Sequence, residues 1–537
     1  MSSKKTTGSY YTPDHISGFI LNYLAKDLRN KTNLSILEPS VGDGAFVKAF
    51  NESKLSTKDK SIKFTGIDFI EPELLKAKKA SAKKPKKNTT YEFICTDFLE
   101  TQKQLTAEYQ LIVGNPPYIS KKLLTKKQVD FCGDIHVSAG LSTNSIKNIW
   151  SAFLIRCCQL LSDDGILSFI LPAEMLQVSF ANELRSFVSN VFIRVEIFTF
   201  NELLFDCKGQ DTILLIGYKQ HINPGQYYTH ISDINDLLSN KFKMVKNQAL
   251  NTNNTKWSHH MLDSKDLDFL YNIASTLHEI DYYCESKPGI VTAANNFFII
   301  NNQTEDQYHL NNYTHPIIQK GLFVNGSVVF NEDDFEHLQQ QGRPTKVLVF
   351  NDNNSGYLTD KIQDYLKIGE ELEIPLRYKC TKRKTWYHIP NISNIPEGFF
   401  FKRSHNYPKL LKNNANVLVT DSAYKIQMRD GFAINNLVYS FYNSFTLLFA
   451  ELEGRYYGGG VLELIPKEFQ NLPLPYVNIS VEGFNNFSSS FERKNTILDV
   501  LTINDQFILG ESLGLSLEAI SKIQLIYKKL ISKRLRY

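Results

Sequence analysis

Four strand-like segments between residues 34 and 115 each end in a polar side chain that is suited to ligand contact. They are 34–37 before Glu38, 63–67 before Asp68, 91–96 before Asp97, and 111–114 before Asn115. Helix-like stretches separate these segments, and this alternation predicts an α/β sheet. Because ligands of open α/β sheets bind at the carboxyl ends of the strands, we expect the four polar side chains to gather at one edge.

The loop after the first segment predicts a nucleotide-binding corner. Residues 38–46 read Glu-Pro-Ser-Val-Gly-Asp-Gly-Ala-Phe, so Gly42 and Gly44 allow a tight turn and close approach of a ligand before a helix begins. Neither GxGxxG nor GxxxxGK[ST] occurs, which disfavours NAD and a P-loop triphosphate. An acid such as Asp68 can accept hydrogen bonds from ribose hydroxyls, and Asp97 with Phe98 suits the edge and face of a purine.

The fourth segment ends in Asn115-Pro116-Pro117-Tyr118, which can form a pocket for a flat group that carries an amine. The Asn115 side-chain oxygen and the Pro116 carbonyl are hydrogen-bond acceptors, and the two prolines make the corner stiff. The Tyr118 ring offers a face for stacking. Adenine N6 is one amine that fits this set. The alternative is an ordinary turn, since Asn-Pro often begins one.

Bulk composition sets wide limits. A chain of 537 residues with 42% hydrophobic and 22% charged residues is expected to form two or three globular domains. A net charge of +4 neither requires nor excludes nucleic acid. Seven cysteines without a CxxC pair predict a reduced protein with no metal site. The sequence shows no membrane-spanning run and no signal-peptide core, which predicts a cytoplasmic protein with no membrane partner.

The ordered motifs resemble those of γ-class DNA adenine-N6 methyltransferases of restriction–modification type, which use S-adenosylmethionine. The resemblance runs over residues 8–220. It implies a Rossmann-like methyltransferase domain at 1–225, with a mixed sheet that contains an antiparallel hairpin, and no metal. The cofactor-binding residues that it implies are Tyr11, Thr12, Glu38, Pro39, Ser40, Gly42, Asp68, Asp97, Phe98 and Asn115. Position 68 departs from the pattern, because the family more often has Glu there.

The same resemblance implies a catalytic set of Asn115, Pro116, Tyr118 and Phe205. Segments 196–198 and 211–218 are the expected hairpin, and Phe205 between them matches the aromatic residue that stacks on a flipped base. The alternative for Phe205 is a core position. Adenine N6 is a poor nucleophile because its lone pair is delocalised, so placement of the amine beside the methyl donor matters more than a strong base. No cysteine nucleophile is needed.

Residues 226–537 are predicted to form an α+β target-recognition domain with a basic C-terminal helix. Segments 288–299 and 454–460 resemble parts of such domains, and basic side chains interleave with aromatic ones at 377–405. The alternative for such a charge run is a solvated surface. The predicted contacts to double-stranded DNA are Arg377, Lys382, Arg383, Lys384, Trp386, Lys402, Arg403 and Arg455.

Other functions share parts of this pattern. Protein-glutamine methyltransferases also carry Asn-Pro-Pro-Tyr but are much shorter, and cytosine-N4 enzymes usually have Ser at the place of Asn115. RNA as substrate and a non-catalytic DNA-binding subunit stay open. A separate cognate restriction endonuclease is a further candidate partner. Pro13-Asp14 with Glu52-Ser53-Lys54 formally spells a nuclease signature, which we interpret as coincidence because both parts lie within the cofactor domain.

Overall fold

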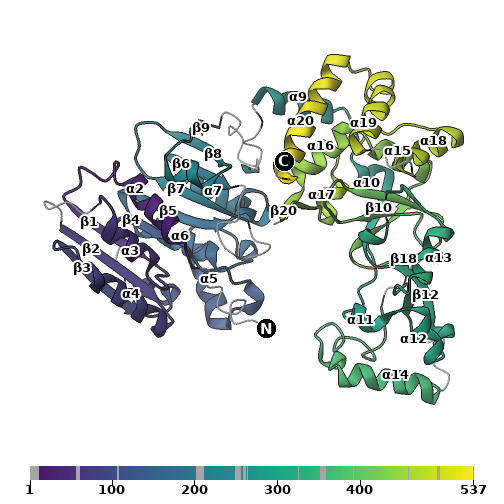
Figure 1. The fold of residues 1–537 in the computed structure, drawn as a ribbon, viewed down its shortest axis with the longest axis horizontal. Coiled ribbons are helices and arrows are strands. Elements are labelled where there is room, and N and C mark those ends of the chain that lie inside the picture. Colours follow the sequence, from purple (N-terminus) through teal and green to yellow (C-terminus); the bar gives the residue numbers. More distant parts are fainter. Residues whose placement is uncertain are drawn as a thin grey trace. The chain divides into compact units, whose positions relative to one another are not determined.

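The computed structural model describes most of the chain, in two compact units (Figure 1). The described residues are 11–55, 61–103, 105, 108–200, 211–247, 256–257, 262, 264–324, 326–350, 358–390, 392, 394–457, 459–492 and 496–535. The first unit is Met1–Leu267 with Tyr457–Gly459, and the second is Asp268–Tyr456 with Gly460–Tyr537. Within these ranges, every helix is too short or too polar to cross a membrane.

The first unit is built on a nine-stranded mixed sheet in the order β3-β2-β1-β4-β5-β7-β6-β8-β9. Its strands are β1 Asn33–Glu38, β2 Ser61–Asp68, β3 Thr89–Cys95, β4 Tyr109–Gly114, β5 Leu161–Pro172, β6 Arg194–Phe200, β7 Thr212–Tyr218, β8 Gly225–Ile231 and β9 Val245–Lys246. Strands β1 to β5 are parallel to one another, and β7 runs antiparallel to both β5 and β6. The predicted α/β class, with an antiparallel hairpin in a mixed sheet, is confirmed.

Helices cover both faces of this sheet because side chains alternate along the strands. Ile36 faces the cluster that contains α2, α3 and α4, whereas Leu37 faces the cluster of α5, α6 and α7. The helices are α2 Asp14–Leu24, α3 Ala45–Glu52, α4 Glu71–Lys83, α5 Lys126–Ser138, α6 Trp150–Leu160, α7 Asn182–Val191 and α8 Ile234–Leu238, and α9 Ser264–Ala274 follows at the boundary between the units. Both sides of the central parallel strands β1 and β4 are therefore largely buried, as their apolar sequences require, whereas the edge strand β3 is only partly buried.

The sheet continues past residue 225. Strand β8 pairs in parallel with β6, and β9 pairs antiparallel with β8. The sequence Gly-Gln-Tyr-Tyr-Thr-His-Ile of β8 lacks the aliphatic run of the earlier strands, so the sequence pattern did not reveal it.

The second unit is α+β, as predicted. Its sheets are ordered β10-β19-β15-β17-β13, β11-β14-β12-β18 and β16-β21-β20. The strands are β10 Cys284–Pro288, β11 Ile299–Ile300, β12 Thr314–Ile318, β13 Val329–Phe330, β14 Lys346–Leu348, β15 Gly398–Phe401, β16 Arg403–Ser404, β17 Lys409–Asn413, β18 Leu418–Val419, β19 Ala423–Met428, β20 Arg455–Tyr457 and β21 Val461–Glu463. The helices are α10 Ile280–Tyr283, α11 Asn295–Phe298, α12 Asn302–Gln307, α13 Glu332–Gln340, α14 Asp360–Glu371, α15 Ile434–Phe441, α16 Ser444–Glu453, α17 Pro466–Gln470, α18 Val481–Glu492, α19 Ile497–Asp505 and α20 Leu517–Leu535.

Candidate active site

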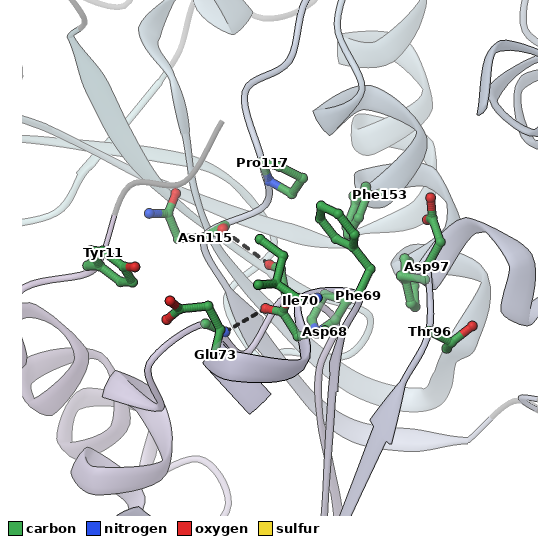
Figure 2. A pocket seen from close by; sticks show the side chains of 14 residues that line it. Tyr11, Asp68, Phe69, Ile70, Glu73, Thr96, Asp97, Asn115, Pro117 and Phe153 are labelled. Carbon is green, nitrogen blue, oxygen red and sulfur yellow. Dashed lines mark hydrogen bonds between the residues drawn. The ribbon is translucent and has the colours of Figure 1, made fainter. Parts of the chain in front are cut away.

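A pocket lies at the carboxyl ends of β1, β2, β3 and β4 (Figure 2). Its walls are formed by Tyr11, Pro39, Ser40, Gly42, Asp68, Phe69, Ile70, Glu73, Thr96, Asp97, Phe98, Asn115, Pro117 and Phe153. Tyr11 and Asp97 stand at opposite ends of the pocket, with Asp68 between them. Eight of the ten predicted cofactor-binding residues therefore come together. The other two, Thr12 and Glu38, are buried and do not line the pocket surface.

Hydrogen bonds join the loops that surround the pocket. The Asp68 carboxylate accepts from the backbone N–H of Gly42 and from that of Ile70, each at 2.9 Å. The Ser40 hydroxyl donates to the backbone carbonyl of Asn115 at 3.2 Å. Figure 2 shows the Asp68–Gly42 and Ser40–Asn115 bonds as dashed lines. The first, second and fourth strand ends are thus held in fixed relation before any ligand arrives.

Glu38, the last residue of β1, is an acid buried beneath this edge. Its side-chain Oε2 is buried and has no hydrogen-bond partner. Burial raises the pKa of Glu38 well above its usual value, and the nearby charges of Asp43 and Asp68 raise it further. A buried carboxylate is costly unless it is paired, so this position is suited to a cationic ligand group.

The two glycines of the first loop have different roles. Gly42 has φ of +50° and lines the pocket, and a Cβ placed there would meet nothing closer than the Tyr11 ring at 4.0 Å. Gly44 has φ of +84°, and a Cβ there would lie 2.8 Å from the Cα of Ala77 in α4. Gly42 therefore forms part of the pocket wall, whereas Gly44 allows α3 to pack closely against α4.

Helix α5 contacts the third strand end through Gln128. The Asp97 carboxylate accepts from the backbone N–H of Leu99 at 3.0 Å and from the Gln128 amide at 3.0 Å. The Gln128 side chain also accepts from the backbone N–H of Thr125 at 3.2 Å, as part of a capping box at the start of α5. This contact could not be predicted from a local sequence pattern, because Gln128 lies 31 residues away from Asp97.

The Asn-Pro-Pro-Tyr segment begins where β4 ends. Pro117 lines the pocket with Asn115, whereas Pro116 is buried. The Tyr118 ring is only 8% exposed, and its hydroxyl lies 2.8 Å from Asn115 Oδ1 and 3.0 Å from the carbonyl oxygen of Ile170. Stacking of Tyr118 on a target base stays a prediction. Phe205 lies outside the described residues.

Six lining residues were not among the sequence candidates: Phe69, Ile70, Glu73, Thr96, Pro117 and Phe153. Phe69 follows Asp68 directly, and its 54% exposure marks an apolar ring at the pocket. Closeness to Asp68 in sequence could have indicated Phe69 and Ile70. Phe153 comes from α6, and only the fold shows that its side chain reaches the pocket. The described residues contain no group of three or more His, Cys, Asp or Glu that could hold a metal ion.

In the second unit, several residues of the predicted DNA surface make contacts within the fold, and their contact with DNA stays a prediction. Arg383 donates to the backbone carbonyls of Val291, Thr292 and Trp386 at 3.1, 2.9 and 3.3 Å. Arg377 donates to the carbonyl of Ala293 at 3.0 Å. These guanidinium groups hold the 291–293 loop, so internal bonds engage donors that we expected to contact phosphates.

Trp386 is also a packing residue. Its ring lies 5.5 Å from that of Phe297 and 6.2 Å from that of Phe298, and it fills the space that a side chain at Gly369 would need. Lys382 and Lys384, in contrast, are exposed.

The remaining predicted contacts differ in exposure. Arg455 pairs with Glu468 at 2.9 Å and its side chain is 16% exposed, so it is mainly a structural ion pair. Arg403 pairs with Glu463 at 3.1 Å but keeps 62% of its side chain exposed. Lys402 is half-buried.

The basic C-terminal helix contains a buried arginine. Arg534 binds both carboxylate oxygens of Glu451 at 2.8 Å and donates to the backbone carbonyls of His405, Asn406 and Gly460. All five of its N–H donors are therefore used. Arg534 fixes two loops of the second unit, whereas Lys528 and Lys529 on the same helix are exposed.

Two family models match the chain over complementary ranges. Residues 16–205 match the Eco57I restriction-modification methylase, and residues 254–509 match the C-terminal domain of the Type II methyltransferase M.Eco57I. Together these ranges cover most of both units. The chain therefore belongs to the DNA methyltransferases of restriction–modification type.

Several curated proteins are similar to it in sequence. The Type II methyltransferase M.AccI of Acinetobacter calcoaceticus is 23% identical over 434 residues, which are 78% of this chain and 75% of that protein. The Type II restriction enzyme and methyltransferase RM.Eco57I of Escherichia coli is 25% identical over 52% of this chain, but the match spans only 27% of that longer protein. M.HincII of Haemophilus influenzae is 28% identical over 37% of this chain and 35% of its own length.

Solved structures share the fold. The Type IIL restriction-modification enzyme MmeI, determined in complex with DNA, has a TM-score of 0.58 at 12% identity and covers 96% of this chain and 72% of its own. The DrdV–DNA complex has a TM-score of 0.55 at 12% identity, over 91% of this chain and 57% of that one.

Proposed function

We propose that this protein transfers a methyl group from S-adenosylmethionine to N6 of a flipped-out adenine within a specific sequence of double-stranded DNA. The observation that carries the proposal is the pocket itself. Three acids at the ends of β1, β2 and β3 lie in or beneath the same sheet edge as Asn115 at the end of β4. This arrangement supports a methyl-donor site and an amine-binding site side by side.

The residues present fit S-adenosylmethionine, which supplies an electrophilic methyl group when bound. This ligand carries an ammonium group, a sulfonium centre, ribose hydroxyls and an adenine ring. The unpartnered Oε2 of Glu38 is suited to a cation. Asp68 keeps lone pairs for hydroxyl groups beyond its two backbone bonds. Asp97, Phe69 and Phe98 offer an acceptor and aromatic faces for the purine.

The target amine would be held by Asn115 and the Pro116 carbonyl. An amide oxygen has two lone pairs, so Asn115 Oδ1 can accept from the Tyr118 hydroxyl and from the amine together. Two acceptors favour a pyramidal nitrogen whose lone pair is directed at the methyl group. Placement of this kind, rather than a strong base, supplies the acceleration.

Double-stranded DNA is proposed as the substrate because the chain belongs to a family of DNA methyltransferases and because MmeI has this fold in a complex with DNA. Adenine N6 cannot be reached inside a duplex, so the base must leave the stack. The proposal extends to action in the cytoplasm, with a separate cognate restriction endonuclease as a candidate partner.

The decisive experiment incubates the purified protein with methyl-labelled S-adenosylmethionine and unmodified genomic DNA, and then maps modified bases by long-read sequencing. We expect N6-methyladenine in one sequence context. Asn115→Ala should lower the rate by about a thousandfold while binding of S-adenosylmethionine, measured by calorimetry, persists. Asn223→Ala, an exposed position in the first unit, is the control and should retain full activity. Full activity of Asn115→Ala, or label found only on protein or RNA, would overturn the proposal.

A further inference from the structure

Residues 374–388 of the second unit, called here the basic turn segment, begin with a single 3-10 turn at Ile374–Leu376 and continue as a series of turns and bends. The buried side chains of Ile374 and Cys380 anchor it from within. Backbone bonds close the turns, for example from Cys380 N–H to the Arg377 carbonyl at 2.8 Å. Together with the bonds from Arg377 and Arg383 to the 291–293 loop, these contacts give the segment a fixed shape.

The outer side of the segment carries apolar and cationic groups. Tyr378 is 78% exposed and Leu376 is 74% exposed. Lys379, Lys382 and Lys384 are also exposed, and the Lys382 ammonium lies 5.8 Å from the centre of the Tyr378 ring. No Asp or Glu occurs from 374 to 388. The segment therefore presents an aromatic ring among positive charges.

This arrangement has a chemical preference. Lysines attract phosphate groups, and an exposed aromatic ring packs on a sugar or a base. An acidic protein could pair with the lysines but would leave the aromatic ring without a suitable partner. DNA carries phosphates beside sugars and bases, so it can contact both the lysines and the ring. Because the turns are fixed in advance, little ordering cost is added when a ligand binds.

We propose that the surface formed by Leu376, Tyr378, Lys379, Lys382 and Lys384 is a contact site for duplex DNA. The lysines neutralise phosphates, and Tyr378 packs against a sugar or base edge. Arg377 and Arg383 act as positioning residues that hold the surface in shape through their bonds to the 291–293 loop. This inference rests on the proposed function, since it assumes that DNA is the substrate.

The test measures binding of a fluorescein-labelled mixed-sequence duplex by anisotropy over a range of salt concentrations. For each lysine that neutralises a phosphate, the slope of log Kd against log salt falls by about 0.9 on substitution. We expect that change in Lys379→Gln and in Lys382→Gln. Lys361→Gln, an exposed site on α14, is the matched control and should keep the original slope.

Tyr378 is tested by a pair of variants. Tyr378→Ala should weaken binding by about tenfold with an unchanged salt slope, because packing of a ring against a sugar or base edge is not ionic. Tyr378→Phe should bind like the original protein, since the ring and not the hydroxyl makes the contact. The side chain is exposed, so the thermal unfolding midpoint should be unchanged in both variants. An unchanged midpoint shows that weaker binding comes from the loss of a DNA contact and not from unfolding of the protein.

The two proposals fail in distinguishable ways. If the original protein binds and methylates DNA while the Tyr378 and lysine variants keep its Kd and slope, the surface proposal is wrong and the methyltransferase proposal stands. If the original protein neither binds nor methylates DNA, the proposed function is wrong, and the surface proposal falls with it.

Discussion

The acids of the first unit and the arginines of the second differ in what their side chains already touch. Glu38 has a buried oxygen without a hydrogen-bond partner, whereas Arg534 uses all five of its donors inside the protein. Glu38 therefore has an oxygen available to a ligand, whereas the buried Arg534 has no donor left for one. A charged residue at a strand end is therefore better evidence of a ligand site than one in a basic cluster. In a basic cluster, the same side chain can be used for hydrogen bonds within the fold instead of contact with a ligand.

The largest expected effect concerns Arg534. Arg534→Met would leave Glu451, which is fully buried, as an unpaired carboxylate, and this should lower the free energy of unfolding by about 3–5 kcal/mol. Urea denaturation measures the loss. Lys528→Met on the exposed face of the same helix should change stability by at most about 0.5 kcal/mol. Equal losses in the two variants would show that Arg534 has no special structural role.

A second comparison separates neighbouring cations in the basic turn segment. Arg383→Ala removes bonds to three backbone carbonyls and should lower the free energy of unfolding by about 2 kcal/mol. Lys382→Ala, an exposed change, should cost no more than about 0.5 kcal/mol. The two values come from parallel denaturation curves. If Lys382→Ala costs as much as Arg383→Ala, the assignment of anchors and outer contacts is wrong.

Substitution of Glu38 is expected to raise the free energy of unfolding, whereas the two arginine substitutions lower it. Because burial raises the pKa of Glu38, the folded state favours the protonated acid, so stability falls as pH rises from the ordinary carboxyl pKa toward the raised one. Glu38→Gln removes this penalty and should add about 1 kcal/mol at pH 7. The gain should disappear below about pH 4, where the acid is protonated in both states.

The same variant should bind S-adenosylmethionine more weakly, because a neutral amide attracts a cation less than a carboxylate does. Calorimetric titration of the variant and the original protein checks this part. A destabilised Glu38→Gln at pH 7 would mean that the buried oxygen is already stabilised by a contact within the fold.

The last comparison concerns the hydroxyl of Tyr118. Tyr118→Phe keeps the buried ring and loses the hydroxyl that bridges Asn115 and Ile170, which should cost about 1 kcal/mol of stability. We expect kcat to fall while the Kd for S-adenosylmethionine stays constant, since the hydroxyl orients Asn115 and does not line the pocket. An unchanged kcat would indicate that the backbone alone orients the amide.

The sequence was most informative where local chemistry decides the structure. Short strand-like segments that end in an acid or amide identified β1, β2 and β4, and their parallel pairing brings Asp68 and Asn115 to the same pocket. Strand β8 was missed because its sequence, Gly-Gln-Tyr-Tyr-Thr-His-Ile, has only one aliphatic residue and does not alternate between apolar and polar residues.

In the second unit, the prediction of DNA contacts was limited because the hydrogen-bond partners of the arginines lie far away in the sequence. A basic run gives no indication of which side chains point inward, because that depends on acceptors far away in the chain. The carbonyl that Arg383 binds at Thr292 is 91 residues distant, and the loop that Arg534 binds at Asn406 is 128 residues distant. Only the folded structure separates these arginines from the exposed lysines beside them.

The two backbone bonds of Asp68 have a consequence for observing ligand arrival. The amides of Gly42 and Ile70 both depend on this one carboxylate, so a ligand that holds the carboxylate still also restrains both loops. Hydrogen–deuterium exchange at these two amides should therefore slow together when the pocket fills. The pocket thus contains a pair of natural reporters that register occupancy without any label.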